Sequence, residues 1–246
     1  MLAVSTLGQL ASHPRVSALR RFITSWHLSC LSADATRGVS EAGPQERLSE
    51  TGDNLPNVIQ HLKERYPERL EKILSILSEW VPCLEKVDTE LVMDGRLLLQ
   101  IKDTPFEKPV SAKFASDGML KMLSFLTLLY APEPPQLIGL EEPENYLYPR
   151  LLNGLVEEYS EALGLSQLMI ATHSPYFVNG LRAEEVWVLY RDEQGFTVCK
   201  RASEMQGIKD FLEAGAKLGY LWMEGFFEVG DPLTNAGGPQ RGRNTD

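Results

Sequence analysis

Two adjacent carboxylates follow a short apolar run. In the segment LIGLEEPENYLYP the run Leu137–Leu140 leads directly into Glu141 and Glu142, and a proline comes next. Like charges at the end of a buried strand repel each other, so a compensating cation such as Mg²⁺ is expected beside them. One carboxylate would help to hold the metal, and the other would orient and polarise an attacking water. The alternative is a pair of solvated glutamates in a strand-to-helix loop.

Two further segments suit phosphate chemistry. His173 follows an apolar stretch in MIATHSP, and an imidazole at that place can donate a hydrogen bond to a phosphate oxygen. Ser116, Asp117 and Gly118 form a small polar loop that opens a helix, and the backbone N–H groups of a helix N-terminus favour an anion. Each has a structural alternative, namely a hydrogen-bonded structural histidine and a plain N-cap at Ser116 or Asp117.

The elements that must position these groups alternate between helix and strand. Apolar periodicity and turn residues predict helix, strand, helix, strand, helix, strand over residues 118–191, with QLMIATHS as a buried strand. This order indicates an α/β fold with a mainly parallel sheet flanked by helices. Sites in such sheets gather at the carboxyl ends of the strands, where Glu141, Glu142 and His173 all fall.

Proline and glycine residues indicate where the remaining helices and hairpins begin, end or turn. Residues 55–81 carry apolar side chains at helical spacing, and Pro67 divides them into two helices. Asp94-Gly95 between two apolar runs predicts a hairpin, and a second hairpin is expected to turn near residues 192–195. A further helix is expected to carry Pro149 in its first turn.

Composition limits the classes of protein that fit. The apolar fraction of 43% predicts a real core, and the net charge of −10 (24 basic minus 34 acidic residues) argues against a uniformly basic nucleic-acid surface. Three scattered cysteines without a CxxC pair favour reduced, buried thiols in a cytoplasmic protein. The longest apolar stretch, Met119–Ala131, is interrupted by Lys121, Ser124 and Thr127, so no membrane span is expected. The N-terminal segment lacks a charged start followed by a continuous apolar block, so no signal peptide is expected.

Taken in order, four segments resemble the C-terminal part of an ABC-type ATPase head, in the branch that includes RecF, SMC-like proteins and small AAA-labelled ATPases of defence and repair loci. ASDGML is similar to the signature loop of that family, and LIGLEEPE to its Walker B strand with the catalytic glutamate. ENYLYP is similar to its D-loop, and ATHSP to its switch histidine. The resemblance extends from about Leu19 to the segment EGFFEVGDPL.

The resemblance implies a P-loop NTPase fold that uses ATP and Mg²⁺. Glu141 would take the acidic position on the magnesium side, which is usually Asp in the wider family; the extra methylene puts direct metal contact in question. Glu142 would be the general base for water, and His173 would contact the γ-phosphate.

The resemblance also implies a second ATPase head as partner, in a homo- or heterodimer that sandwiches ATP. Ser116 and Gly118, with Asp117 between them, would form the loop that meets the γ-phosphate of ATP held by the second head. Asn145 would lie at the dimer seam. DNA is suggested as a client by the resemblance alone.

One motif of the family has no counterpart here. The phosphate-cradling pattern G-x-x-x-x-G-K-[ST] is absent from the 246 residues, and Gly215-Ala216-Lys217 is its nearest fragment. We therefore expect residues 1–231 to form the C-terminal two-thirds of a head, with residues 232–246 as a disordered tail.

Three functional hypotheses remain open. The chain can belong to an ATP-hydrolysing head whose P-loop lies upstream of it. It can instead be a truncated, non-hydrolysing subunit that acts in trans on a complete ATPase partner. The weakest hypothesis is a metal-dependent nuclease built on Glu141, Glu142 and Glu144, because no DxD or similar acidic pair stands out elsewhere.

Overall fold

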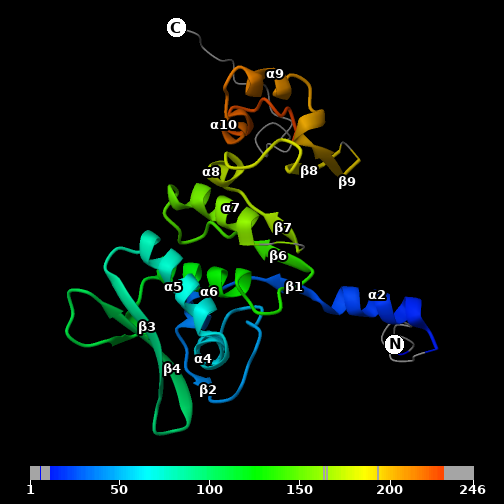
Figure 1. Ribbon diagram of the computed structural model, residues 1–246. Helices are drawn as coiled ribbons and strands as arrows, with labels where there is room; N and C mark the ends of the chain where they lie inside the picture. Colours follow the sequence, from blue (N-terminus) through cyan, green and yellow to red (C-terminus); the bar gives the residue numbers. More distant parts are fainter. Residues whose placement is uncertain (1–5, 7–11, 163, 165, 193, 230–246) are drawn as a thin grey trace. The chain divides into compact units, whose positions relative to one another are not determined.

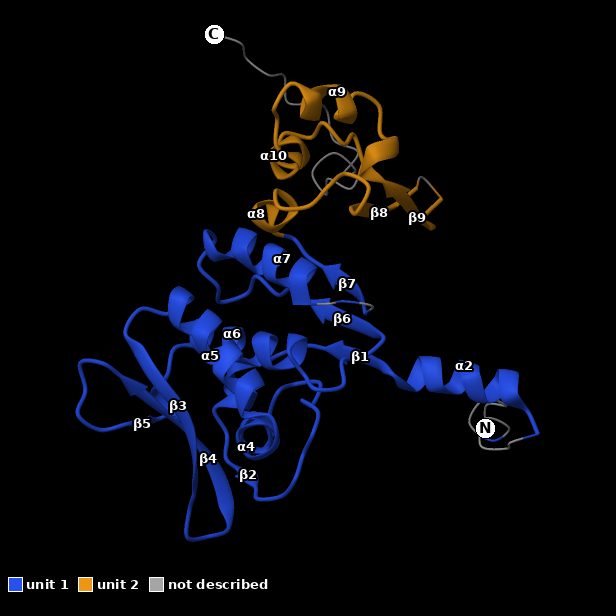
Figure 2. Cartoon of the chain, viewed as in Figure 1, with its two compact units in different colours: residues 1–173 blue, residues 174–246 orange. Residues whose placement is uncertain are grey.

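The computed structural model describes residues 6, 12–162, 164, 166–192 and 194–229 (Figure 1). The chain divides into two compact units, residues 1–173 and residues 174–246 (Figure 2). The predicted tail at residues 232–246 lies outside the described residues. The assignment of residues 1–231 to one head stays a prediction.

The first unit contains a parallel sheet of three strands in the order β1-β6-β7. Its strands are β1 (Trp26–Ser29), β6 (Leu137–Glu141) and β7 (Gln167–Ala171). Helix α7 (Leu151–Ala162) connects β6 to β7, as a crossover between parallel strands requires. The prediction of an α/β fold with a parallel sheet flanked by helices is confirmed.

The described residues cover one face of this sheet much better than the other. Ile138 and Leu140 of β6 are buried on one face, whereas Leu28 and Met169 on the other face are 54% and 60% exposed. Leu28 leans over Gly139, where a Cβ would come within 2.5 Å of the leucine side chain. The prediction of a buried strand for QLMIATHS is therefore wrong. β7 is an edge strand in the described part of the chain, and its residues alternate between exposed and half-buried.

Helix α6 (Asp117–Leu129) is the centre of the first unit. Every residue from Met119 to Leu129 is buried, as expected of a helix that is apolar on nearly all sides. Three helices pack against it, namely α3 (Ala33–Thr36), α4 (Leu55–Arg65) and α5 (Pro67–Trp80). The predicted division between two helices at Pro67 is confirmed. On the α7 side, the rings of Phe125 and Tyr159 meet edge to face at 6.3 Å.

Helix α7 begins later than its sequence suggests. The prediction placed Pro149 in the first turn, but the helix starts at Leu151. The Leu151 N–H donates to the Tyr148 carbonyl at 2.9 Å, so Pro149 belongs to the turn that leads into the helix.

An antiparallel sheet forms the other layer of the first unit. Its strand order is β2-β4-β3, and β5 pairs with β4. The strands are β2 (Ser40–Glu41), β3 (Leu84–Leu91), β4 (Arg96–Asp103) and β5 (Val110–Ser111). The hairpin predicted at Asp94-Gly95 is confirmed, and Gly95 adopts a φ of 82° that suits glycine.

Helix α2 (Pro14–Thr24) precedes β1 and carries exposed apolar side chains, including Phe22 and Ile23. Within the part of the chain that the structure describes, none of the helices combines the length and the apolar character that crossing a bilayer requires.

The prediction of buried cysteines is wrong. Cys30, Cys83 and Cys199 are free thiols, and all three are exposed.

The second unit is small and has a core of its own. Its elements are α8 (Pro175–Val178), β8 (Trp187–Arg191), β9 (Thr197–Arg201), α9 (Ile208–Glu213) and α10 (Leu218–Met223). Val178, Ile208, Leu221 and Phe227 are among its buried residues. The second predicted hairpin is confirmed as β8–β9. Because β8 pairs antiparallel with β9, it departs from the parallel arrangement that the alternation of elements predicted.

Candidate functional site

The site is built at the carboxyl edge of β6 and β7, which lie side by side (Figure 1). Glu141 is in register with Ala171, so both strands end at the same level. The next residue, Glu142, donates its N–H to the Ala171 carbonyl at 2.8 Å. Glu142 then turns the chain with a φ of 43°, in the left-handed region that residues other than glycine rarely adopt.

Three donors hold Glu142 in this conformation. Its carboxylate accepts a hydrogen bond from Asn145 Nδ2 at 2.7 Å. Its main-chain carbonyl accepts from the Asn145 N–H at 3.2 Å and from Lys121 Nζ at 3.0 Å. A strained residue persists only where its surroundings fix it, and such residues concentrate at functional sites. The structure thus brings together the predicted base Glu142 and the predicted seam residue Asn145.

Lys121 was missed as a site residue. It lies on α6, is only 3% exposed, and its ammonium also faces the rings of Phe125 and Tyr146 at 5.7 and 5.8 Å. Burial lowers the pKa of Lys121, and the neighbouring Glu144, Cys30 and Glu142 partly offset that effect. The signal in the sequence was the single charged residue within the mainly apolar stretch Met119–Leu129.

The predicted phosphate-binding loop approaches Glu142 from the N-terminus of α6. Ser116 is the N-cap, and its exposed hydroxyl oxygen accepts from the Met119 N–H at 3.3 Å. Gly118 lies against the Tyr146 carbonyl, since a Cβ at this glycine would stand 2.8 Å from that oxygen. The N-cap alternative is therefore correct for Ser116, and it leaves the hydroxyl hydrogen free to meet an anion.

Arg37 fixes the same loop from the other side. Its guanidinium pairs with the Asp117 carboxylate and donates to the Ala115 carbonyl at 2.7 Å. Asp117, predicted to bind the cofactor, is thus an ion-pair partner in this structure. Nothing in the sequence pointed to Arg37, because 80 residues separate it from its partner.

Glu144 ties the Glu142 loop to the end of β7. Its Oε1 accepts from the Thr172 hydroxyl at 2.7 Å and from the His173 N–H at 2.9 Å. Its Oε2 is buried and has no hydrogen-bond partner among the described residues. The His173 side chain is exposed. Glu144 therefore sets the direction of the segment that carries His173.

The residues at this edge fit magnesium and phosphate only in part. Glu141 is exposed, and no hydrogen bond or ion pair of its carboxylate is found among the described residues. One such carboxylate suits Mg²⁺, which usually takes one or two carboxylates together with phosphate oxygens and water. The described residues contain no group of three or more His, Cys, Asp or Glu side chains that could hold a metal by themselves. A metal here would thus depend on a phosphate ligand.

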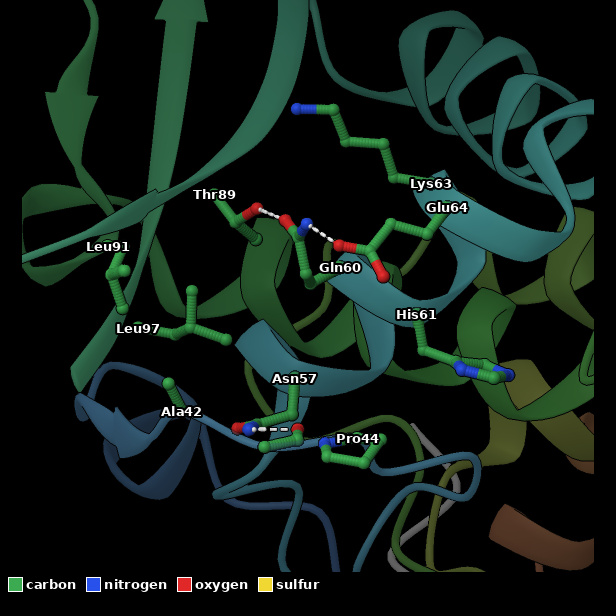
Figure 3. A pocket seen from close by; sticks show the side chains of 11 residues that line it. Ala42, Pro44, Asn57, Gln60, His61, Lys63, Glu64, Thr89, Leu91 and Leu97 are labelled. Atoms are coloured by element: carbon green, nitrogen blue, oxygen red, sulfur yellow. Dashed lines mark hydrogen bonds between the residues drawn. The ribbon is translucent and has the colours of Figure 1, made fainter. Parts of the chain in front are cut away.

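A separate hollow of about 480 Å³ lies between α4 and the β3–β4 hairpin (Figure 3). Its polar side chains bond mainly to protein groups: Gln60 lies between Thr89 and Glu64, and Asn57 Nδ2 donates to the Glu41 and Gly43 carbonyls at 2.9 Å. None of the predicted site residues lines this hollow.

One family model matches most of the chain. The family is described as "AAA domain, putative AbiEii toxin, Type IV TA system", and the match covers residues 8–179. No curated protein matches the chain.

Solved structures with a similar fold include SMC heads. A structure of "the SmcHead bound to the C-winged helix domain of ScpA" is 11% identical with a TM-score of 0.50, and the match covers 71% of this chain and 55% of that one. An Smc head domain with a coiled coil and joint from Pyrococcus yayanosii is 10% identical with a TM-score of 0.45, covering 63% of this chain and 30% of that one. A third, from a study of "ATP-driven dimerization and DNA stimulated activation of SMC ATPases", is 12% identical with a TM-score of 0.44. The match covers 65% of this chain and 98% of that one. At these identities the likeness concerns the fold alone.

Proposed function

Since the chain belongs to this AAA-domain family, we propose that it is the part of an ABC-type ATPase head that carries the signature loop, the catalytic glutamate and the switch histidine. The observation that supports this most is the Glu142 loop. A carboxylate at the end of a buried strand is held by Asn145, and the loop that carries it contacts the first turn of α6 where the Tyr146 carbonyl lies against Gly118. Oriented carboxylates of this kind activate water in phosphoryl transfer.

In this proposal each predicted site residue of the chain has a separate role in ATP hydrolysis. Glu142 accepts a proton from the attacking water, and His173 donates a hydrogen bond to the γ-phosphate. Glu141 would be the residue that helps to hold Mg²⁺. Bound magnesium would neutralise phosphate charge.

The second head is part of the same proposal. Ser116 and Gly118 meet the γ-phosphate of the nucleotide that the second head holds, and Asp117 keeps the loop in place through Arg37. Asn145 lies at the seam between the heads. Because G-x-x-x-x-G-K-[ST] does not occur in these 246 residues, the P-loop must come from further sequence joined to the chain or from a partner.

A second form of the proposal follows from the missing motif. The chain would act in trans, contributing Ser116 and Gly118 to a complete ATPase without hydrolysing ATP itself. Replacing Ser116 with arginine separates this form from a passive association. The trans form is wrong if the effect on the partner's ATPase survives that change.

A DNA client and a cytoplasmic location complete the proposal. One of the similar structures comes from a study of "DNA stimulated activation of SMC ATPases". The net charge of −10 gives DNA binding no support in this chain, so added duplex DNA is a necessary arm of the assay.

The experiment measures ATP turnover and ATP binding by the chain together with the polypeptide that carries the P-loop, with and without Mg²⁺. Glu142→Gln is expected to keep ATP binding and to lower turnover by about 100-fold or more, because the amide cannot accept the proton. Unchanged turnover in this variant would remove Glu142 from the role of base. Cleavage of nucleic acid with Mg²⁺ or Mn²⁺ and no nucleotide would favour the nuclease hypothesis instead.

A further inference from the structure

Lys121 is a charged group buried where an apolar residue would pack more easily. It is 3% exposed on the most buried helix of the first unit. Burying an ammonium is costly unless hydrogen bonds or opposite charges compensate it. Its ammonium donates a hydrogen bond to the Glu142 carbonyl at 3.0 Å, and among the described residues no carboxylate lies close enough to form an ion pair with it.

The hydrogen bond from Lys121 to the Glu142 carbonyl suggests a function for the lysine. Glu142 has a φ of 43°, and its carbonyl is turned toward α6. An ammonium at this carbonyl stabilises the left-handed conformation directly, since any relaxation of the main chain would break the hydrogen bond. Carboxylates of Glu142 and Glu144 attract the ammonium at longer range.

Lys121 also shares a helix face with Gly118. Residues three apart on a helix are neighbours on its surface. Gly118 contacts the Tyr146 carbonyl, and Lys121 contacts the Glu142 carbonyl, so one face of α6 touches both ends of the Glu142–Tyr146 loop. A displacement of the α6 N-terminus is therefore passed to Glu142 by direct contact.

We propose that Lys121 is a positioning residue that holds Glu142 in its strained conformation and couples it to the phosphate-facing end of α6. This inference rests on the proposed ATPase function for its consequence, but its physical content can be tested without ATP. When the α6 N-terminus is engaged by the second head, Lys121 keeps the Glu142 carboxylate in line for its water. When α6 moves away, Lys121 draws the Glu142 main chain with it.

The test is amide hydrogen exchange on the full chain, resolved at the Glu142 and Asn145 amides, whose acceptors are the Ala171 and Glu142 carbonyls. Lys121→Met is expected to speed exchange at both amides by about tenfold, because a hydrogen bond from a charged donor contributes that much. Lys121→Arg keeps a charged donor and is expected to stay within about threefold of wild type.

Ser124→Ala is the matched control. Ser124 is buried on the same helix, but its hydroxyl donates to the Leu120 carbonyl of its own helix at 2.9 Å. Its loss should leave the Glu142 loop unchanged. The proposal is overturned if Lys121→Met exchanges like wild type, or if Ser124→Ala speeds the two amides equally.

A measurement on the wild type covers the case in which Lys121→Met does not fold. Scalar coupling across the hydrogen bond between Lys121 ¹⁵Nζ and the Glu142 ¹³C carbonyl is expected by NMR. Lysine ammonium protons that exchange freely with water and show no such coupling would refute the assignment.

ATP turnover then tests the link to the reaction. With the P-loop supplied, Lys121→Met should lower kcat by about 10- to 100-fold with KM for ATP within about twofold, the pattern of a displaced catalytic group. If the wild type hydrolyses no ATP, the proposed function fails while the exchange result stands. If exchange is unaffected, the role of Lys121 fails whatever the turnover.

Discussion

Replacing Gly118 with alanine tests whether the phosphate-facing loop and the Glu142 loop are in contact. A Cβ at Gly118 would lie 2.8 Å from the Tyr146 carbonyl oxygen, which is closer than real Cβ contacts. The obstacle is main chain rather than a flexible side chain, so either α6 or the Glu142 loop must shift. The change should therefore disturb the site as well as the stability of the first unit.

Two opposing effects set the magnitude. Alanine favours a helix over glycine by about 0.5–1 kcal/mol. Overpacking in a well-packed region costs roughly 1–3 kcal/mol. The clash wins, and a net destabilisation of about 1 kcal/mol is expected. Gly154 in α7 is the matched control, because a Cβ there would stand 3.7 Å from the Trp80 ring in ordinary contact. Gly154→Ala should stabilise by about 0.5 kcal/mol.

The assay is urea unfolding followed by far-UV circular dichroism. With a slope of about 2 kcal/mol per molar urea, the midpoint should fall by about 0.5 M for Gly118→Ala and rise by about 0.25 M for Gly154→Ala. Faster amide exchange at Glu142 and Asn145 should accompany the first change only. If Gly118→Ala raises the midpoint as Gly154→Ala does, the contact between the two loops is absent and the reasoning is refuted.

Two further predictions concern other parts of the chain. Gly219→Ala should destabilise the second unit by more than about 2 kcal/mol, because a Cβ would lie 2.0 Å from the Pro175 carbonyl oxygen; exchange protection should be lost in α10 and kept in α6. Burial lowers the pKa of His27, an effect that Glu50 opposes and Arg47 reinforces. The unfolded chain therefore binds this proton more readily, and stability should fall as pH drops below the unfolded value of about 6.5. His27→Gln should flatten this part of the pH profile of the urea midpoint, whereas equal slopes in both proteins would identify another titrating group.

The local sequence predicted the elements well. The helix division at Pro67, the hairpin at Asp94-Gly95 and the N-terminus of α6 at Ser116 are confirmed, because proline, glycine and N-capping residues act over a few residues. The position of Glu142 at the end of a strand was predicted for the same reason. Its hydrogen-bond partner Asn145 is only three residues further along the chain, so the contact follows from the local turn.

Contacts between segments that are distant in the sequence could not be predicted from local patterns. Arg37 reaches Asp117 across 80 residues, and Lys121 reaches Glu142 across 21. Burial of β7 was predicted from its apolar composition, but composition does not say whether a strand ends up central or at an edge. Met169 is exposed because the register places it on the uncovered face of the sheet.

The left-handed conformation of Glu142 sets stability and activity against each other at one position. Glycine adopts a φ of 43° without penalty, whereas another residue loses about 1–2 kcal/mol there. Selection for stability alone would therefore favour glycine or asparagine at this position. Retention of glutamate in a relative would be evidence of selection for its carboxylate. A relative with glycine there would be a more stable protein that has given up the reaction, and this residue can sort active from inactive members before any assay is made.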